Sequence, residues 1–420
     1  MLGQRPGLER ILALLEAMNN PEKGLKTVHV AGTNGKGSSC WMITSILIKA
    51  GYRVGSFLSP HICSYRERIT VNGRCIEARD LNHYLDGVLD HVPALLKAGL
   101  DHPTEFEILT AMAFEYFRDQ KVDIAVVEVG MGGRYDSTNV LTPLVSLITT
   151  IDYDHTAFLG SDLAQIAWNK AGIIKPEIPV VTGLLPDIAQ TVIEEHCQSL
   201  HAPLYSSSMF GVQYHGQPDL SLVDISGPDL ALRAVPFSLL GDYQLENLCS
   251  VLTVLQVLKN QGFSIPPGVI ASTLDDLSFP GRMQVLNRQP LVIADAAHNP
   301  HGCRALAVSL HSLWPERPRV LVCGMLDDKD VRAALEALGP GTRVCIATRP
   351  EGERSGQWER LGSIWQELFP EKELHLVEDP LQACKLAMGI LKADEYMLLT
   401  GSFYILGTVY LNRASLLANS

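Results

Sequence analysis

Short runs of apolar residues alternate with helical stretches along the first half of the chain. Continuous apolar runs, rich in β-branched residues, occupy residues 27–32, 53–59, 123–130, 143–152 and 178–183. Runs of this length without polar alternation are typical of parallel strands that are covered on both faces. Between the first two runs, the segment from Ser38 to Ala50 has the pattern of a helix.

The pattern changes twice in the second half. Between residues 184 and 240 the apolar runs give way to short alternating pieces, LSLVDIS and LALRAVPFSL, which predict a small antiparallel patch. From Pro290 onward a second series predicts strands at residues 291–298, 319–325, 343–348, 374–379 and 395–401. Helices are predicted between them, near residues 302–313, 330–338, 357–368 and 380–392. Such a series is sufficient for an independent Rossmann-like domain.

The predicted fold class is therefore α/β, and the chain is predicted to form two domains. The segment 278–290, with two prolines and one glycine, is the predicted hinge. Residues 1–283 would form an N-terminal domain with a mostly parallel sheet and a small antiparallel patch. Residues 284–420 would form a C-terminal Rossmann-like α/β domain. The length of 420 residues agrees with two or three domains of ordinary size.

Composition narrows the class of protein. Hydrophobic residues make up 46% and charged residues 19%, which is typical of a soluble globular protein. A net charge of -12 without a basic stripe argues against nucleic acid as a partner. The nine cysteines include no C-x-x-C pair, which favours free thiols in a reducing compartment. No apolar run reaches the ~18 residues that a membrane span needs. We therefore expect a cytoplasmic protein with no membrane association.

Residues 29–39, HVAGTNGKGSS, form an unusual phosphate-binding loop. The common pattern begins with glycine and places serine or threonine directly after Gly-Lys. Here Val30 replaces the first glycine, and Gly37 moves Ser38 one place further on. The segment nevertheless has a buried strand before it, three glycines, a lysine and a helix N-terminus, all of which suit an anion. The alternative is a glycine-rich turn that binds no ligand.

The variant loop resembles that of the Mur ligase superfamily, in particular the folylpolyglutamate synthase/dihydrofolate synthase family. Other segments resemble the same family in the same order along nearly the whole chain. These are residues 57–73, 104–117, 127–140, 151–175, 241–247, 279–284, 295–302, 327–330 and 400–407. The resemblance implies a P-loop-type ATPase domain at 1–283 and a glutamate-ligase domain at 284–420.

The resemblance also implies the residues that bind ATP and two Mg²⁺ ions. The implied ATP-binding residues are Gly32, Thr33, Asn34, Gly35, Lys36, Gly37, Ser38, Asn247, Arg282, Asp295 and His298. The implied Mg²⁺ ligands are Ser38, Ser59, Glu128, His155 and, if carbamylated to N6-carboxylysine, Lys170. Lys36, His155 and Lys170 would be the catalytic residues.

The residue types by themselves leave alternatives open at several of these positions. Glu128 ends a predicted strand, where a carboxylate is either a hard oxygen ligand or a helix-capping or solvated edge residue. His155 suits a ligand or a hydrogen-bonded core histidine. Lys170 is either a surface lysine with a structural partner or a buried amine with a lowered pKa. For Asn247 the alternative to ATP binding is a helix cap, and for Asp295 it is a strand-end carboxylate without a ligand; each alternative suits the residue as well as ATP binding does.

By the same resemblance, the folate-type substrate would contact Thr104, Phe106, Glu107, Tyr135 and Asp136. An aromatic ring beside a carboxylate suits a flat heterocycle with ring N–H groups. For Phe106 the alternative is ordinary core packing. Relatives usually carry a further helix before the segment that begins at Gly7. We expect that its absence from this sequence reflects a misassigned start or a pterin pocket with one incomplete wall.

Together these features predict an ADP-forming ligase of folate biosynthesis. The γ-phosphate of ATP would pass to a folate-type carboxylate, and the amine of L-glutamate would attack the acyl phosphate. The acceptor could be dihydropteroate, a tetrahydrofolate that already carries glutamate, or both. Two alternatives are a Mur-type ligase acting on a peptidoglycan precursor and a non-catalytic nucleotide-binding scaffold. We expect small-molecule partners only, and a monomer.

Overall fold

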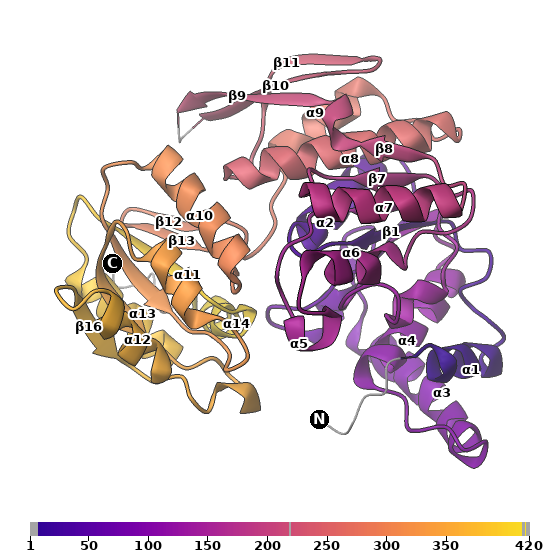
Figure 1. Cartoon of the computed structure of the whole chain (residues 1–420), viewed down its shortest axis with the longest axis horizontal. Helices are drawn as coiled ribbons and strands as arrows, with labels where there is room; N and C mark the ends of the chain where they lie inside the picture. The colour runs from indigo at the N-terminus through magenta and orange to yellow at the C-terminus, as the bar shows by residue number, and fades with distance from the viewer. Residues whose placement is uncertain (1–6, 218–219, 414–415, 417–420) are drawn as a thin grey trace. The chain divides into compact units, whose positions relative to one another are not determined.

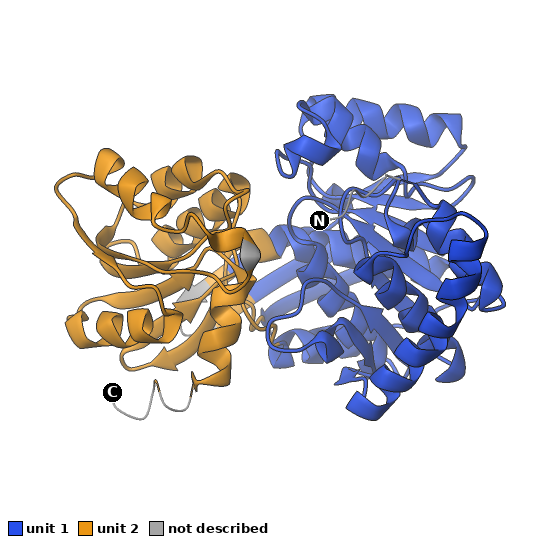
Figure 2. Cartoon of the chain, turned by 90° about the horizontal axis from the view of Figure 1, so that it is seen from below, with its two compact units in different colours: residues 1–214, 223–236, 245–277 blue, residues 215–222, 237–244, 278–420 orange. Residues whose placement is uncertain are grey.

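The computed structural model describes residues 7–217, 220–413 and 416 (Figure 1). The prediction about the chain before Gly7 concerns residues outside this part. Contacts divide the chain into two compact units (Figure 2). Unit 1 comprises residues 1–214, 223–236 and 245–277, and unit 2 comprises residues 215–222, 237–244 and 278–420.

Unit 1 is built on an eight-stranded sheet. Its strand order is β4-β3-β2-β5-β1-β6-β7-β8. The strands are β1 (Thr27–Ala31), β2 (Val54–Phe57), β3 (Ile69–Val71), β4 (Arg74–Cys75), β5 (Ile124–Glu128), β6 (Val145–Ile148), β7 (Val180–Thr182) and β8 (Leu204–Ser206). The pairs β2–β5, β5–β1, β1–β6, β6–β7 and β7–β8 are parallel, whereas the pairs β2–β3 and β3–β4 are antiparallel. The mostly parallel sheet predicted from the apolar runs is confirmed.

Helices cover both faces of this sheet. They are α1 (Glu9–Ala17), α2 (Lys36–Lys49), α3 (Ala78–Lys97), α4 (Glu105–Asp119), α5 (Thr156–Leu159), α6 (Leu163–Ala171), α7 (Asp187–Ser199), α8 (Asp242–Asn260) and α9 (Pro267–Asp276). Helices α1, α3 and α4 share one apolar cluster with Phe57 and Val127. Helices α6 and α7 share another with Ala31 and Ile148. Helix α2 connects β1 to β2 and so crosses the sheet in the direction opposite to the connections that contain α6 and α7. Because crossovers between parallel strands are right-handed, α2 lies on the other face of the sheet, where it contacts α9.

Residues 184–240 contain more regular structure than the sequence predicted. The alternating pieces form β10 (Leu220–Gly227) and β11 (Leu230–Pro236), which join β9 (Gly211–Gln217) in a three-stranded sheet. Two residues connect β10 to β11, so these strands are antiparallel as predicted. The sequence prediction missed α7 and β8. The buried residues of α7, namely Ala189, Ile193 and Cys197, have helical spacing, but two of them are small and give a weak apolar signal.

Unit 2 is built on a six-stranded sheet of order β12-β13-β17-β14-β15-β16. The strands are β12 (Gln284–Arg288), β13 (Leu291–Ala294), β14 (Arg319–Cys323), β15 (Thr342–Ala347), β16 (Glu373–Leu376) and β17 (Tyr396–Thr400). The helices are α10 (Pro300–Leu313), α11 (Val331–Leu338), α12 (Arg360–Leu368), α13 (Pro380–Ile390) and α14 (Phe403–Leu411). All five predicted strands are present. The sixth, β12, lies inside the segment predicted to be a hinge and pairs antiparallel with β13 at the sheet edge.

Within the described part of the chain, none of the helices combines the length and the apolar character that crossing a membrane requires.

Candidate active site

The loop between β1 and α2 has a backbone that only glycine accommodates at two positions. Gly32 and Gly35 have φ values of 155° and 81°, in the region that disfavours residues with a Cβ. A Cβ atom on Gly32 would lie 1.9 Å from Thr149 Oγ1, and one on Gly35 would lie 2.3 Å from Asn247 Oδ1. The glycines therefore let neighbouring side chains approach the loop closely.

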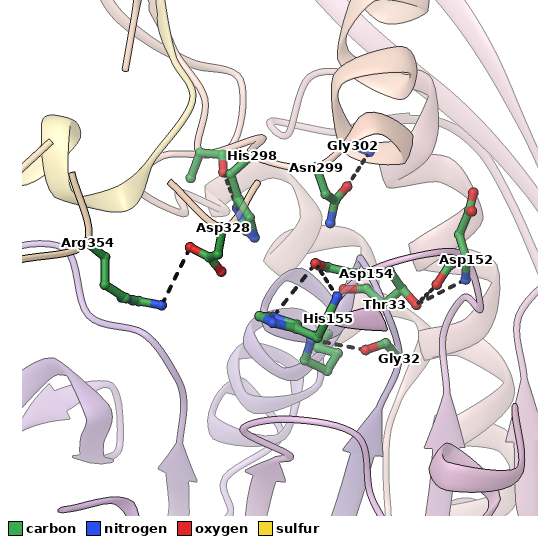
Figure 3. Close-up of polar contacts among 12 residues, drawn as sticks. Gly32, Thr33, Asp152, Asp154, His155, His298, Asn299, Gly302, Asp328 and Arg354 are labelled. Carbon is green, nitrogen blue, oxygen red and sulfur yellow. Dashed lines mark hydrogen bonds and ion pairs between the residues drawn. The ribbon is translucent and has the colours of Figure 1, made fainter. Parts of the chain in front are cut away.

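Two threonines at the end of β6 hold this loop in place. The backbone N–H of Thr33 donates to Thr150 O at 2.8 Å, and that of Asn34 donates to Thr150 Oγ1 at 2.9 Å. Thr149 Oγ1 donates to Asn34 O at 2.6 Å. Thr33 Oγ1 also bonds the backbone of Asp152 in both directions, at 3.0 Å each (Figure 3). The sequence interpretation missed Thr149 and Thr150, although two hydroxyl residues ending an apolar strand were a usable signal.

The loop concentrates positive charge at the start of α2. Lys36 is the first residue of this helix, and its ammonium group donates to the backbone oxygens of Gly32 at 3.1 Å and Thr33 at 3.3 Å. The side chain thus folds back over the loop. Ser38, which is buried, lies in the first turn of the same helix. A folded-back ammonium beside a helix N-terminus is a favourable environment for phosphate.

Gly35→Ala is expected to weaken ATP binding by about tenfold or more, because left-handed strain and the contact with Asn247 both displace the loop. Calorimetric titration with ATP measures the effect. Gly51→Ala is the matched control, since Gly51 has a comparable φ of 96° but an added Cβ there meets nothing within 4 Å. Equal ATP affinities of the two variants would contradict the proposed role of the loop.

A buried carboxylate lies at the carboxyl end of the neighbouring strand. Glu128 is the last residue of β5, pairs in register with Val30 and is almost fully buried. Its Oε2 atom accepts the backbone N–H of Ser59 at 3.0 Å. This burial and bonding contradict a solvated edge residue. Hard oxygens of a carboxylate and of hydroxyls such as Ser38 and Ser59 are chemically suited to Mg²⁺.

Lys170, near the end of α6, is buried. Its exposed fraction is 2%, so the alternative of a surface lysine is wrong. Burial first, and then the charge of Lys36, lower the pKa of Lys170 to about 7, whereas Asp154 opposes the shift. A large fraction of the Lys170 amine is therefore neutral near physiological pH.

His155 and Asp154 lie together between β6 and α5 (Figure 3). The Nε2 atom of His155 is 3.8 Å from Asp154 Oδ1, and the imidazole is 33% exposed. His155 is therefore not a core histidine. Among the described residues, no group of three or more His, Cys, Asp and Glu is arranged to hold a metal. The predicted Mg²⁺ set contains only two such residues, Glu128 and His155, and it stays a prediction.

The predicted folate residues at α4 have partners within the protein. Thr104 and Glu107 form a reciprocal capping box, with Glu107 N–H donating to Thr104 Oγ1 at 3.2 Å and Thr104 N–H donating to Glu107 Oε2 at 2.7 Å. Arg10 forms an ion pair with Glu107 at 3.1 Å. The ring of Phe106 stacks on that of Phe57 with a centroid distance of 5.5 Å. It also covers Gly130, whose added Cβ would lie 2.6 Å from the ring.

Tyr135 and Asp136 occupy the loop that follows β5. Tyr135 is 49% exposed, whereas Asp136 is buried and caps the short 3₁₀ helix η2 (Ser137–Val140). The Asp136 carboxylate accepts the backbone N–H groups of Thr138 at 3.0 Å and Met131 at 2.9 Å. Burial raises its pKa, and these hydrogen bonds oppose that shift. Folate contacts by both segments stay predictions.

The predicted ATP residues of the second half lie mostly in unit 2. Asp295, directly after β13, accepts the backbone N–H of Met283 at 2.8 Å and the Tyr243 hydroxyl at 3.0 Å. Burial raises the pKa of Asp295, and Arg282 lowers it. The Arg282 guanidinium lies 4.9 Å from the centre of the Phe403 ring.

The predicted ATP set also includes His298 and Asn247, which belong to different units. His298 Nδ1 lies 2.9 Å from Ala296 O, and both residues belong to unit 2. Asn247 belongs to unit 1 and lies inside α8, so it is not a helix cap. Binding of ATP by residues of both units stays a prediction.

Comparison with known proteins relates the whole chain to one group of ligases. The Mur ligase middle domain matches residues 30–255, and the Mur ligase glutamate ligase domain matches residues 281–403. The chain is 33% identical over 414 residues to dihydrofolate synthase/folylpolyglutamate synthase of Bacillus subtilis, covering 97% of this chain and 95% of the relative. It is 32% identical to the Escherichia coli protein of the same name, covering 96% and 90%.

Solved structures agree with the sequence matches. Mycobacterium tuberculosis folylpolyglutamate synthase complexed with ADP and AMPPCP has a TM-score of 0.91 at 31% identity, covering 97% of this chain and 95% of that one. E. coli FolC in complex with DHPP and ADP has a TM-score of 0.87 at 29% identity, covering 99% and 95%. The chain is thus similar over nearly its full described length to ligases that bind adenine nucleotides.

Proposed function

This chain belongs to the folylpolyglutamate synthase/dihydrofolate synthase family of Mur ligases, and from that membership we propose that it is an ADP-forming ligase. The reaction joins the amino group of L-glutamate to a carboxylate of a folate-type substrate. The γ-phosphate of ATP passes first to that carboxylate, which gives an acyl phosphate and ADP. Attack by the glutamate amine then forms the amide and releases phosphate.

The observation that carries this proposal is the concentration of charge at the carboxyl edge of the unit 1 sheet. Lys36 and the N-terminus of α2 would hold the phosphates of ATP and stabilise the charge that develops during transfer. Glu128, with the hydroxyls of Ser38 and Ser59, would hold Mg²⁺, which neutralises phosphate charge when bound. His155, and Lys170 as a carbamate, would complete a second ion site.

We assign the glutamate-ligase role to residues 284–420. The support is the match of residues 281–403 to the glutamate ligase domain of Mur ligases. Arg282, Asp295 and His298 would contribute to ATP binding from this half of the chain. Thr104, Phe106, Glu107, Tyr135 and Asp136 would contact the pterin. We further propose that the enzyme acts as a monomer on small molecules alone.

We propose that both dihydropteroate and a mono-glutamyl tetrahydrofolate are substrates. The support is that relatives from B. subtilis and E. coli carry both activities in their names. A peptidoglycan ligase is disfavoured because the similarity spans nearly all of the chain and of these relatives. A non-catalytic scaffold is disfavoured because Lys36, Glu128 and Lys170 are all present and buried or held at the site.

The experiment that tests this proposal is an assay of glutamate-dependent ADP release. Dihydropteroate, mono-glutamyl tetrahydrofolate and a UDP-linked peptidoglycan precursor are compared in parallel reactions. We expect ADP release with both pteroate substrates and none with the UDP-linked acid. Release with one pteroate substrate narrows the activity to one branch. Release only with the UDP-linked acid, or with no acid, contradicts the proposal.

A further inference from the structure

A buried hydrogen-bonded chain links β1 to the loop that follows β5. His29, on β1 three residues before Gly32, is fully buried. Its Nε2 atom lies 2.8 Å from Thr138 Oγ1. Thr138 Oγ1 donates in turn to Asp136 Oδ1 at 2.5 Å. All three residues belong to unit 1, and the chain spans 109 residues of sequence between its first two members.

The direction of these hydrogen bonds fixes the tautomer of His29. A hydroxyl has one proton, and Thr138 gives it to the Asp136 carboxylate, so Thr138 Oγ1 can only accept from the imidazole. The proton of His29 must therefore be on Nε2, which leaves Nδ1 unprotonated. Among the described side chains, Nδ1 of His29 is a buried atom with no hydrogen-bond partner. Burial first, and then the charge of Lys175, lower the pKa of His29 to about 3, which agrees with a neutral ring.

A second chain of hydrogen bonds, whose direction follows from the same argument, holds Ser137, the residue before Thr138. Thr110, on α4, donates its hydroxyl proton to Phe106 O at 2.7 Å. Ser137 Oγ lies 2.7 Å from Thr110 Oγ1, so Ser137 must be the donor in that bond. The start of η2 is thus fastened to α4 through Ser137 and to β1 through Thr138.

These chains fix the loop at residues 130–136, which has close contacts at both ends. Asp136 binds Met131 N–H, and Gly130 lies under the ring of Phe106. In the middle of the loop, an added Cβ on Gly133 would lie 2.9 Å from the backbone oxygen of Lys170. Arg134 N–H also donates to Asn169 O at 2.8 Å. A displacement of Asp136 would therefore move the segment that lies between Phe106 and the backbone of Lys170.

We propose that His29 and Thr138 are positioning residues that set the geometry of loop 130–136 for the folate-type substrate. This inference rests on the proposed function, because Tyr135 and Asp136 are placed there as substrate contacts. His29 and Thr138 are both fully buried, so neither would touch the substrate. Each acts through Asp136, whose carboxylate receives both the hydroxyl and the backbone N–H of Thr138.

The test compares Thr138→Val with Thr138→Ser. Valine keeps the shape of threonine but removes the hydroxyl. The hydrogen bond from His29 Nε2 and the one to Asp136 Oδ1 are therefore both lost, and the Nε2–H of His29 is left without its acceptor. Serine keeps the hydroxyl. We expect Thr138→Val to raise KM for the pteroate substrate about tenfold and to change the dissociation constant of ATP less than twofold. Thr138→Ser should stay within about threefold of the wild type in both measurements.

A spectroscopic readout tests the same inference without turnover. In wild-type protein with ¹⁵N-labelled histidine, the His29 signals should report a proton on Nε2 and none on Nδ1. The difference spectrum against His29→Gln identifies them among the 13 histidines. Thr138→Val should shift these signals, whereas Thr138→Ser should preserve them. This measurement remains informative even where Thr138→Val lowers thermal stability.

The outcomes separate the inference from the proposed function. Absence of turnover with any pteroate by the wild type contradicts the proposed function. Turnover by the wild type with an unchanged pteroate KM in Thr138→Val contradicts only the positioning role. An equal loss of ATP affinity would also overturn it, since that indicates general damage to unit 1. A proton on Nδ1 of His29 would overturn the hydrogen-bond direction on which the inference is built.

Discussion

Lys36→Ala is expected to lower kcat for glutamate-dependent ADP release by at least about a hundredfold, the usual effect of removing one preorganised donor at a site of developing charge. Within the described part of the chain, the ammonium group donates to the backbone oxygens of Gly32 and Thr33, so its removal deletes charge at the phosphate loop and almost no core volume. Thermal unfolding should therefore occur at nearly the wild-type temperature. Steady-state kinetics and a melting curve on the same preparation check both parts.

Lys49→Ala is the matched control for this variant. Lys49 is the last residue of the same helix, and it forms an exposed ion pair with Asp276 at 2.7 Å. Exposed pairs contribute little to stability, so this variant should retain both its activity and its melting temperature. Full activity of Lys36→Ala, or an equal loss in Lys49→Ala, would contradict the assignment of residues 32–38 as the phosphate loop.

Lys170→Ala is expected to lower kcat by about a hundredfold to a thousandfold if a carbamate on this lysine supplies an anion for the reaction. Short carboxylic acids such as acetate should restore part of the activity, because the deleted side chain leaves space for a carboxylate. Lys170→Met should be equally inactive and should not respond to acetate, since the methionine side chain fills that space. Rescue of both variants, or full activity without rescue, would contradict the carbamate.

The pH dependence of Lys170 has a defined sign. Carbamate forms from the neutral amine, so CO₂-dependent activity of the wild type should rise as pH increases through about 7, the lowered pKa of this group. Stability changes in the same direction. Between about 7 and the ordinary value of 10.5, the unfolded chain binds a proton at this lysine that the folded chain does not, so the free energy of unfolding rises with pH across that window. Lys170→Met should lack this contribution in a pH series of denaturant titrations.

The fold was predictable where burial on both faces removed polar residues from the strands. The apolar runs at β1, β5 and β6 are of this kind. Strand β12, in contrast, lies at a sheet edge, and three of the five residues in its sequence QVLNR are polar, so it resembled a linker. Helix α7 was missed because its buried stripe consists largely of small residues. Polar composition at a sheet edge explains the miss of β12, and small side chains explain the miss of α7, whereas the edge strand β16 was found.

The candidate site was predictable only as far as local sequence determines it. The sequence of the phosphate loop predicts its own backbone, because glycines and a following helix are adjacent in the chain. The burial of Lys170 was only partly predictable. Ile166 and Ala167 lie one turn before it on the same buried face of α6, but a lysine beside such a face usually extends its ammonium group into solvent. The partners of His29 were equally hidden, because Thr138 follows it by 109 residues and contacts it only after the sheet has formed.

The attachment of the phosphate loop to Thr149 and Thr150 has a consequence for hydrogen exchange and binding entropy. The amide protons of Thr33 and Asn34 are already bonded within the protein, so they should exchange slowly with solvent before any nucleotide is added. The loop loses its conformational freedom during folding, not during binding. ATP therefore meets a surface whose shape is already set, and its association should be limited by diffusion and desolvation rather than by ordering of residues 32–35.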